Sequence, residues 1–165
     1  MRRHIIGVLL VAIAFSAAAQ DWTETVVEDM TVRHAIVGSE LFLSVSAPTT
    51  GWVAIGFEPT RAMADANILI GYVDGNQVVV EDHYGNGIFS HRPDTRLGGD
   101  DNVTVIGGSE TNRATTIEFS IPLNSGDQYD KVLTAGQTAH VILAWGANDN
   151  TGRQHRRRYS TTIQL

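Results

Sequence analysis

The chain has 165 residues, 12 Lys and Arg against 18 Asp and Glu, and a formal net charge of −6. This length suits one domain with a sizeable core, and the acidic balance disfavours nucleic acid as a partner, because phosphate repels negative charge. The absence of cysteine excludes disulfides, thiolate metal sites, cysteine nucleophiles and covalent cofactor attachment of the CxxCH type.

The N-terminus has the pattern of a secretory signal. Residues 1–4 are basic, residues 5–15 are apolar, and residues 17–19 are three alanines of the kind found at cleavage sites. We therefore expect a cleaved signal peptide at 1–19, a single domain at 20–165 with a charge of about −8, and a periplasmic or secreted location. No later stretch is long and apolar enough to span a bilayer.

The remaining chain predicts short β-strands and no amphipathic helix. Apolar residues alternate or run together over short segments separated by turn residues. These segments lie within 22–36 and at 41–45, 52–57, 67–73, 78–80, 103–106, 114–121, 140–145 and 159–165. Short strands with regular turn signals are typical of sandwiches and barrels. We expect an all-β fold, a two-sheet antiparallel β-sandwich of immunoglobulin-like type with about 9–11 strands.

Two features organise the middle of the chain. In residues 51–81, strand patterns are joined by a loop around Met63 and by a tight turn at Asp74-Gly75-Asn76, whose Gly and Asn tolerate positive φ. Residues 82–102 form the longest segment rich in Gly, Pro, Asn and Asp, which predicts irregular structure. Loops of this length in a compact domain are usually functional.

Few residues offer chemistry. Met63 lies in a loop among small residues, where it serves either as a soft metal ligand or as a rim residue. His155 lies in a loop with four arginines, which is either a solvated basic loop or a site for an anionic ligand. His34 and His140 lie in or beside strands and are expected to be structural. His83 and His91 remain open between structural and functional roles.

Other classes of site have weaker support. There is no GxSxG motif and no thiol, so nucleophilic catalysis is not indicated. No two histidines have the spacing of a zinc site. The Asp-rich loops are compatible with calcium, but without a specific spacing, and a glycosidase pair of carboxylates is not excluded.

Several segments together resemble the DOMON domain. They are GWVAIGF at 51–57, the loop with Met63, ANILIGY at 66–72, SHRPDT at 90–95 and the loop with His155. The resemblance covers about residues 21–165. It implies a β-sandwich of ten or eleven strands, in a secreted or extracytoplasmic domain that binds haem b or, in some branches, is thought to bind sugars.

The resemblance also implies the site residues. Cytochrome members of the family, such as the haem domain of cellobiose dehydrogenase, hold iron between a methionine and a histidine. These positions match Met63 and His155, with His91 in reserve and His83 as a weaker candidate. By nearness in sequence, we expect the cofactor-binding residues to be Trp52, Ile55, Phe57, Ile68 and Ile70 as walls, with Arg61 or Arg157 pairing with propionates.

The expected function is an extracytoplasmic, non-covalent b-type haem domain that passes single electrons between separate redox proteins and is not itself an enzyme. The alternative is a non-enzymatic module that binds a sugar or small ligand through surface aromatics such as Trp22, Trp145 and Tyr84. A third reading is a subunit that docks on a larger redox enzyme. The pair Met63 and His155 separates the first reading from the second.

Overall fold

The computed structural model describes residues 21–165, so the expected signal peptide at 1–19 lies outside the described residues. The described chain is built from strands, with one short 3₁₀ turn, η1 (Asp94–Arg96). The strands are β1 (Thr23–Val27), β2 (Met30–Val37), β3 (Glu40–Ala47), β4 (Val53–Phe57), β5 (Asn67–Asp74), β6 (Gln77–Gly87), β7 (Ser90–Pro93), β8 (Thr104–Glu110), β9 (Thr115–Pro122), β10 (Thr138–Trp145) and β11 (Arg157–Gln164). Across residues 21–165, no helix is both long and apolar enough to cross a bilayer.

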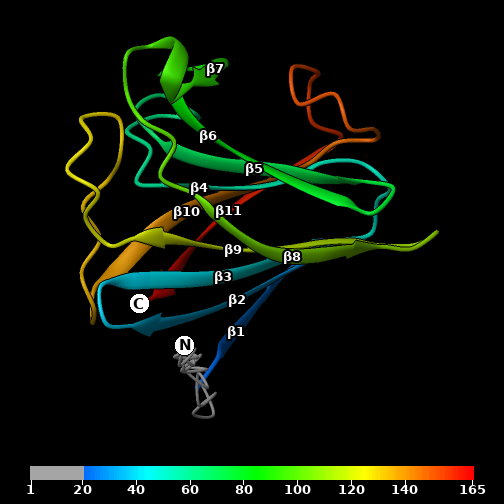
Figure 1. The fold of residues 1–165 in the computed structure, drawn as a ribbon, viewed down its shortest axis with the longest axis horizontal. Coiled ribbons are helices and arrows are strands. Elements are labelled where there is room, and N and C mark those ends of the chain that lie inside the picture. The colour runs from blue at the N-terminus through cyan, green and yellow to red at the C-terminus, as the bar shows by residue number, and fades with distance from the viewer. Residues whose placement is uncertain (1–20) are drawn as a thin grey trace, which may run out of the picture.

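The strands form two antiparallel sheets that face each other (Figure 1). One sheet has the order β1-β2-β3-β9-β8, and the other has the order β11-β10-β4-β5-β6-β7. The expected all-β sandwich is therefore confirmed. The turn at Gly75-Asn76 is also confirmed, because Asp74 pairs with Gln77 and Gly75 has φ of 60°.

The main core lies between the sheets and follows from the alternation of side chains along each strand. On β4, Val53, Ile55 and Phe57 point inward and are fully buried. Phe119 and Ile117 of β9 come to the same core from the other sheet. Burying each side chain of this size stabilises the fold by about 1.5–3 kcal/mol.

The six-stranded sheet also buries residues on its outer face, which is unusual for an antiparallel sheet. A second apolar cluster there contains Trp52, Ala54, Ala66, Ile68 and Ile70. β4 and most of β5 are consequently buried on both faces. The segments around this outer face are the loop 58–66, the β6–β7 hairpin and the loop 146–156.

The segment expected to be irregular, 82–102, is partly regular. β6 continues to Gly87, and β7 pairs back onto it with a register shift between Tyr84 and Gly87. The glycines misled the prediction, because Gly85 belongs to the strand and is required there. A Cβ at Gly85 would collide with the carbonyl oxygen of Met63. The hairpin and the loop 146–156 rise from the six-stranded sheet on the side away from the other sheet (Figure 1).

Candidate functional site

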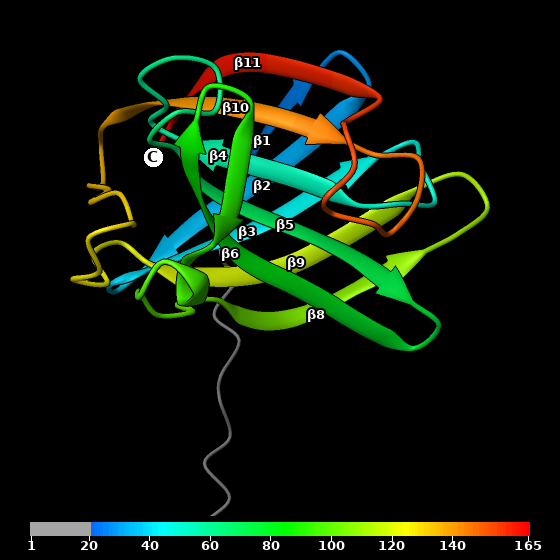
Figure 2. The ribbon, with the colours of Figure 1, turned by 90° about the horizontal axis from the view of Figure 1, so that it is seen from above.

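A cavity of about 860 Å³ lies over the outer face of the six-stranded sheet. Its walls come from three segments that are distant in sequence: the loop 58–66, the β6–β7 hairpin and the loop 146–156. Figure 2 looks onto this face and shows the hairpin and the loop 146–156 on either side of β4 and β5. Cofactor and ligand pockets have volumes of roughly 300–1,000 Å³, so this cavity is large enough for a cofactor.

The floor of the cavity consists of small and apolar residues from adjacent strands. Ala54 of β4 pairs with Ala144 of β10 on one side and with Ile70 of β5 on the other. One step along, Gly56 pairs with Ile142 and Ile68. Alanine and glycine keep the centre of the floor low, while the isoleucines supply apolar surface.

Met63 is presented by a tightly constrained loop. Ala62 and Asp65 both have positive φ, of 52° and 63°, and the backbone N–H of Ala66 donates to the carbonyl of Met63 at 3.1 Å. The Met63 side chain is half-buried and packs against the outer apolar cluster. Positive φ at a non-glycine residue is uncommon and clusters at functional sites. The backbone thus fixes the thioether at the cavity.

The carboxylate of Asp65 locks the same loop. The hydroxyl of Tyr84 donates to Asp65 Oδ1 at 2.7 Å, and the hydroxyl of Thr60 donates to Oδ2 at 2.6 Å. These two hydrogen bonds, from Thr60 and then Tyr84, lower the pKa of Asp65. The backbone N–H of Asp65 also donates to the carbonyl of Gly85 at 2.8 Å, which ties the loop to β6.

His155 lies in the loop between β10 and β11, far from Met63 in the sequence, and lines the same cavity. The loop is anchored at its base, where the N–H of Arg156 donates to the carbonyl of Trp145 at 2.8 Å. Burial, and then the charge of Arg158, lowers the pKa of His155. The imidazole is therefore neutral at pH 7, which is the form that binds a metal.

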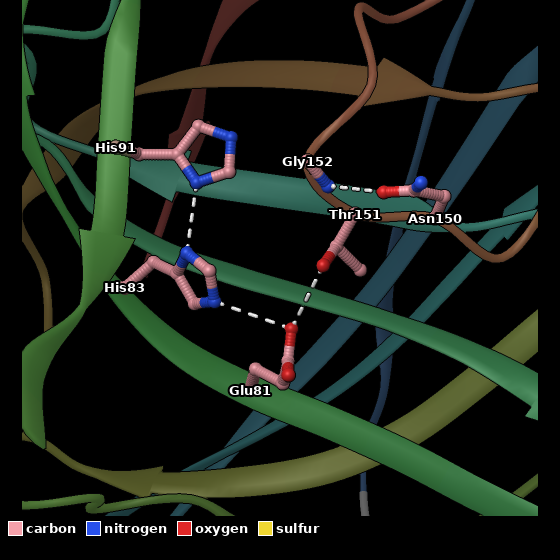
Figure 3. Close-up of polar contacts among 6 residues, drawn as sticks. All are labelled: Glu81, His83, His91, Asn150, Thr151 and Gly152. Atoms are coloured by element: carbon pink, nitrogen blue, oxygen red, sulfur yellow. Dashed lines mark hydrogen bonds and ion pairs between the residues drawn. The ribbon is translucent and has the colours of Figure 1, made fainter. Parts of the chain in front are cut away.

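A chain of polar contacts connects His91 to the loop 146–156 (Figure 3). The Nδ1 atoms of His91 and His83 are 2.8 Å apart, and His83 Nε2 lies 3.2 Å from Glu81 Oε2. Thr151 donates to the same Glu81 oxygen at 3.0 Å. Burial lowers the pKa of His83, and burial followed by the charge of His83 lowers that of His91 to about 4. Both rings are neutral at pH 7, and the network fixes the orientation of His91.

Most of the predicted site residues meet in this cavity. Those that line it are Trp52, Arg61, Met63, Ile68, Ile70, His91 and His155. His83 is buried behind His91. Met63 and His155, which are far apart in the sequence, thus line one cavity.

Three predicted residues lie elsewhere, and strand alternation explains each case. Ile55 and Phe57 do not form cavity walls, because they occupy the inward-facing positions of β4 and belong to the core between the sheets. Arg157 pairs with Trp145 and lines a separate groove, whereas Arg158 pairs with Ala144 on the cavity floor and lines the cavity. Of these two neighbours, Arg158 is therefore the one placed to pair with an anionic group in the cavity.

The aromatic residues of the alternative reading do not form a shared surface. Trp145 is 8% exposed and its Nε1 donates to Asp29 at 3.2 Å. Tyr84 is engaged with Asp65, and Trp22 packs under Arg33 with 5.2 Å between the guanidinium carbon and the ring centroid. A sugar platform built from these three residues is absent from the described chain.

Two groups of lining residues were missed by sequence reasoning. Ala54, Gly56 and Ala144 form the floor, and Ile88 and Phe89 stand at the tip of the β6–β7 hairpin, with Phe89 78% exposed. The floor residues could have been predicted from the sequence, because they alternate with the inward-facing residues of β4 and β10 and so must face outward. The hairpin tip had none, because its strands were hidden by glycines.

Comparison with curated proteins places the chain among larger relatives. It is 30% identical over 112 residues to the human protein "DBH-like monooxygenase protein 1", covering 68% of this chain and 18% of the relative. The mouse protein of the same name is 28% identical over 149 residues, covering 88% and 24%. The chain therefore matches less than a quarter of the length of either relative.

Two solved structures share the fold. The cytochrome b domain of pyranose dehydrogenase from Coprinopsis cinerea superposes with a TM-score of 0.66 at 13% identity, covering 87% of this chain and 81% of that one. The cytochrome domain of Myriococcum thermophilum cellobiose dehydrogenase gives 0.59 at 12% identity, covering 82% and 74%. The family model of the DOMON domain matches residues 28–146. The chain belongs to the DOMON domain family.

Proposed function

We propose that this protein is an extracytoplasmic electron-transfer domain that binds one haem b non-covalently in the cavity over the six-stranded sheet. The observation that carries the proposal is the meeting of Met63 and His155, which are 92 positions apart, at one large cavity with an apolar floor. The two structural neighbours are cytochrome domains, which supports the same cofactor for this fold.

The lining residues fit haem in their chemistry. An apolar slot is supplied by Trp52, Ile68 and Ile70, and neutral imidazoles by His155 and His91. Arg61, Arg153 and Arg158 line the same cavity and provide cationic partners for propionates. With no cysteine in the chain, the attachment is non-covalent.

In the proposed site, Met63 and His155 would hold the iron, with His91 as the reserve histidine. Haem supplies a one-electron couple at its iron, and a thioether ligand raises the potential of that couple. The chain's own part would be to supply Met63 and a histidine as iron ligands, to exclude water with the apolar floor and to neutralise the propionates with arginines. The role proposed for the loaded domain is transfer of single electrons between partner proteins, with no bond of a substrate changed.

The partner is proposed to be a separate redox protein. Ile88 and Phe89 form an exposed apolar tip at the cavity rim, next to residues of the proposed haem site. Exposed apolar residues beside a cofactor suit a transient contact with another protein.

A block of the cavity floor tests the proposal. Replacing Ala144 with phenylalanine is expected to lower hemin affinity by at least about 10-fold, because the ring would occupy the centre of the floor opposite Ala54. The measurement is hemin titration of the purified apoprotein, followed by growth of the Soret band and by quenching of tryptophan fluorescence.

The matched control is Thr138→Phe. Thr138 lies on the same face of β10 as Ala144, but it is exposed and outside the cavity. This variant should bind hemin like the unmodified protein. Equal hemin binding by Ala144→Phe and the unmodified protein would mean that the haem site is not this cavity.

A further inference from the structure

A cluster of two buried carboxylates and one half-buried carboxylate lies on the other side of β6 from the cavity. Asp82 of β6, Asp94 of η1 and Asp130 of the loop between β9 and β10 each place one carboxylate oxygen within 4.8 Å of the others. Side chains alternate along a strand, so His83 points to the cavity while Asp82 points to the opposite face. The cluster is therefore distinct from the proposed haem site.

Asp82 and Asp94 lack some or all of the partners that buried charges normally have, whereas Asp130 accepts hydrogen bonds from Asn67 and Ser125. Asp94 is fully buried, and neither of its carboxylate oxygens has a hydrogen-bond partner within residues 21–165. Asp82 is 4% exposed, and its Oδ1 is also without a partner there. No salt bridge within the described residues involves any of the three aspartates. An isolated buried carboxylate is costly unless it is paired or binds a metal.

The side-chain amide of Asn67 is a second, independent indication that the cluster binds a ligand. Asn67 is 3% exposed, and its amide Nδ2 donates to Asp130 Oδ1 at 2.7 Å, which places the amide group against the cluster. Its Oδ1 has no partner within the described chain. Carboxylates together with an amide oxygen form an all-oxygen donor set.

The charges around the cluster are all negative, which favours either protonation of the carboxyls or a bound cation. Burial, and then the charge of Asp130, raises the pKa of Asp82 to about 8. Burial, and then Asp130 and Asp127, raises that of Asp94 to about 7. The groups that raise these pKa values, besides burial, are all carboxylates, including Asp101.

We propose that Asp82, Asp94, Asp130 and Asn67 form a structural calcium site. Hard oxygen ligands select Ca²⁺ or Mg²⁺ over softer metals. Mg²⁺ keeps several waters and demands octahedral geometry, whereas Ca²⁺ accepts protein oxygens in flexible arrangements, which suits a site with little exposure. The ion would link β5, β6, η1 and the loop before β10, which carry these four residues. The proposed calcium site does not depend on haem binding.

The test uses the mature apoprotein after treatment with chelator. Calcium at 1 mM is expected to raise the melting temperature by at least about 5 °C over the protein in EDTA, because the ion binds only the folded chain. Terbium should bind at the same site and emit on excitation of tyrosine, because Tyr129 lies next to Asp130 in sequence.

The diagnostic variant is Asp94→Asn, with Asp100→Asn as its control. Asparagine keeps the shape of Asp94 but removes its charge, so calcium affinity should fall by at least about 10-fold. In EDTA this variant should melt no lower than the unmodified protein, because a buried carboxyl with no partner has been replaced by a neutral group. Asp100 is an exposed neighbour in the acidic loop and should leave calcium binding unchanged.

Three results would overturn the calcium site. These are no thermal shift with calcium in the unmodified protein, an equal shift in Asp94→Asn, and an equal response to magnesium at the same concentration. None of them bears on hemin binding, which is measured separately through the Soret band.

Discussion

Replacing His155 with alanine is expected to abolish the six-coordinate low-spin spectrum of the hemin-loaded protein. His155 is one of two histidines that line the cavity with Met63, and its lowered pKa keeps the imidazole neutral and able to bind iron. Loss of residues that merely support a metal ligand costs about 10–100-fold in affinity, so loss of the ligand itself should cost at least as much. Visible spectra and hemin titration measure both effects.

The control is His91→Ala in the same cavity. His91 is held through its Nδ1 by His83, and His83 in turn contacts Glu81. If His155 is the ligand, His91→Ala should keep the low-spin spectrum, although it removes the contact between His91 and His83. The reverse pattern, with the spectrum lost in His91→Ala and kept in His155→Ala, would contradict the assignment and move the iron to His91.

The second large effect is a loss of stability with rising pH in the presence of chelator. Asp82 and Asp94 have folded-state pKa values of about 8 and about 7, against an ordinary value of 3.8 for an aspartate side chain. The folded protein therefore holds protons that the unfolded chain has released, and this stabilisation is lost as the pH rises through 7 to 8. Between pH 6.5 and 8.5 the expected loss is about 2–3 kcal/mol of unfolding free energy.

The pH window separates the aspartates from the buried histidines. His83, His91 and His155 have lowered pKa values, so their contribution to stability rises with pH only up to about 6.5. Urea unfolding at pH 6.5 and 8.5 in EDTA measures the aspartate contribution, and Asp82→Asn should flatten it. A stability that is constant or rises over this interval would show that the buried carboxyls are ionised without a cation.

The strands could be predicted because alternation and turn chemistry are local properties of the sequence. The turn at Gly75-Asn76 and the alternation of Ile117, Phe119 and Ile121 needed no tertiary information. The extension of β6 through Gly85 could not be predicted. Glycine is needed there because a side chain would collide with the carbonyl oxygen of Met63, and not because the chain turns. Tertiary contact overrode the local signal.

The sequence named residues that meet at one cavity, but it placed only part of the cavity wall correctly, and the ligand roles of Met63 and His155 remain predictions. Met63 and His155 came from a family resemblance, and the structure brings both to one cavity. Nearness in sequence misplaced Ile55, because successive residues of β4 serve opposite faces and Ala54 and Gly56 form the floor. The carboxylates at positions 82, 94 and 130 lie on three separate segments, so only the fold reveals that they meet.

The most direct test of the proposed function is the visible spectrum of the mature protein, produced with haem available, before and after reduction with dithionite. A bound haem with two axial protein ligands should give a Soret band and, on reduction, sharp α and β bands. A protein that is colourless as isolated and does not bind added hemin would contradict the electron-transfer role.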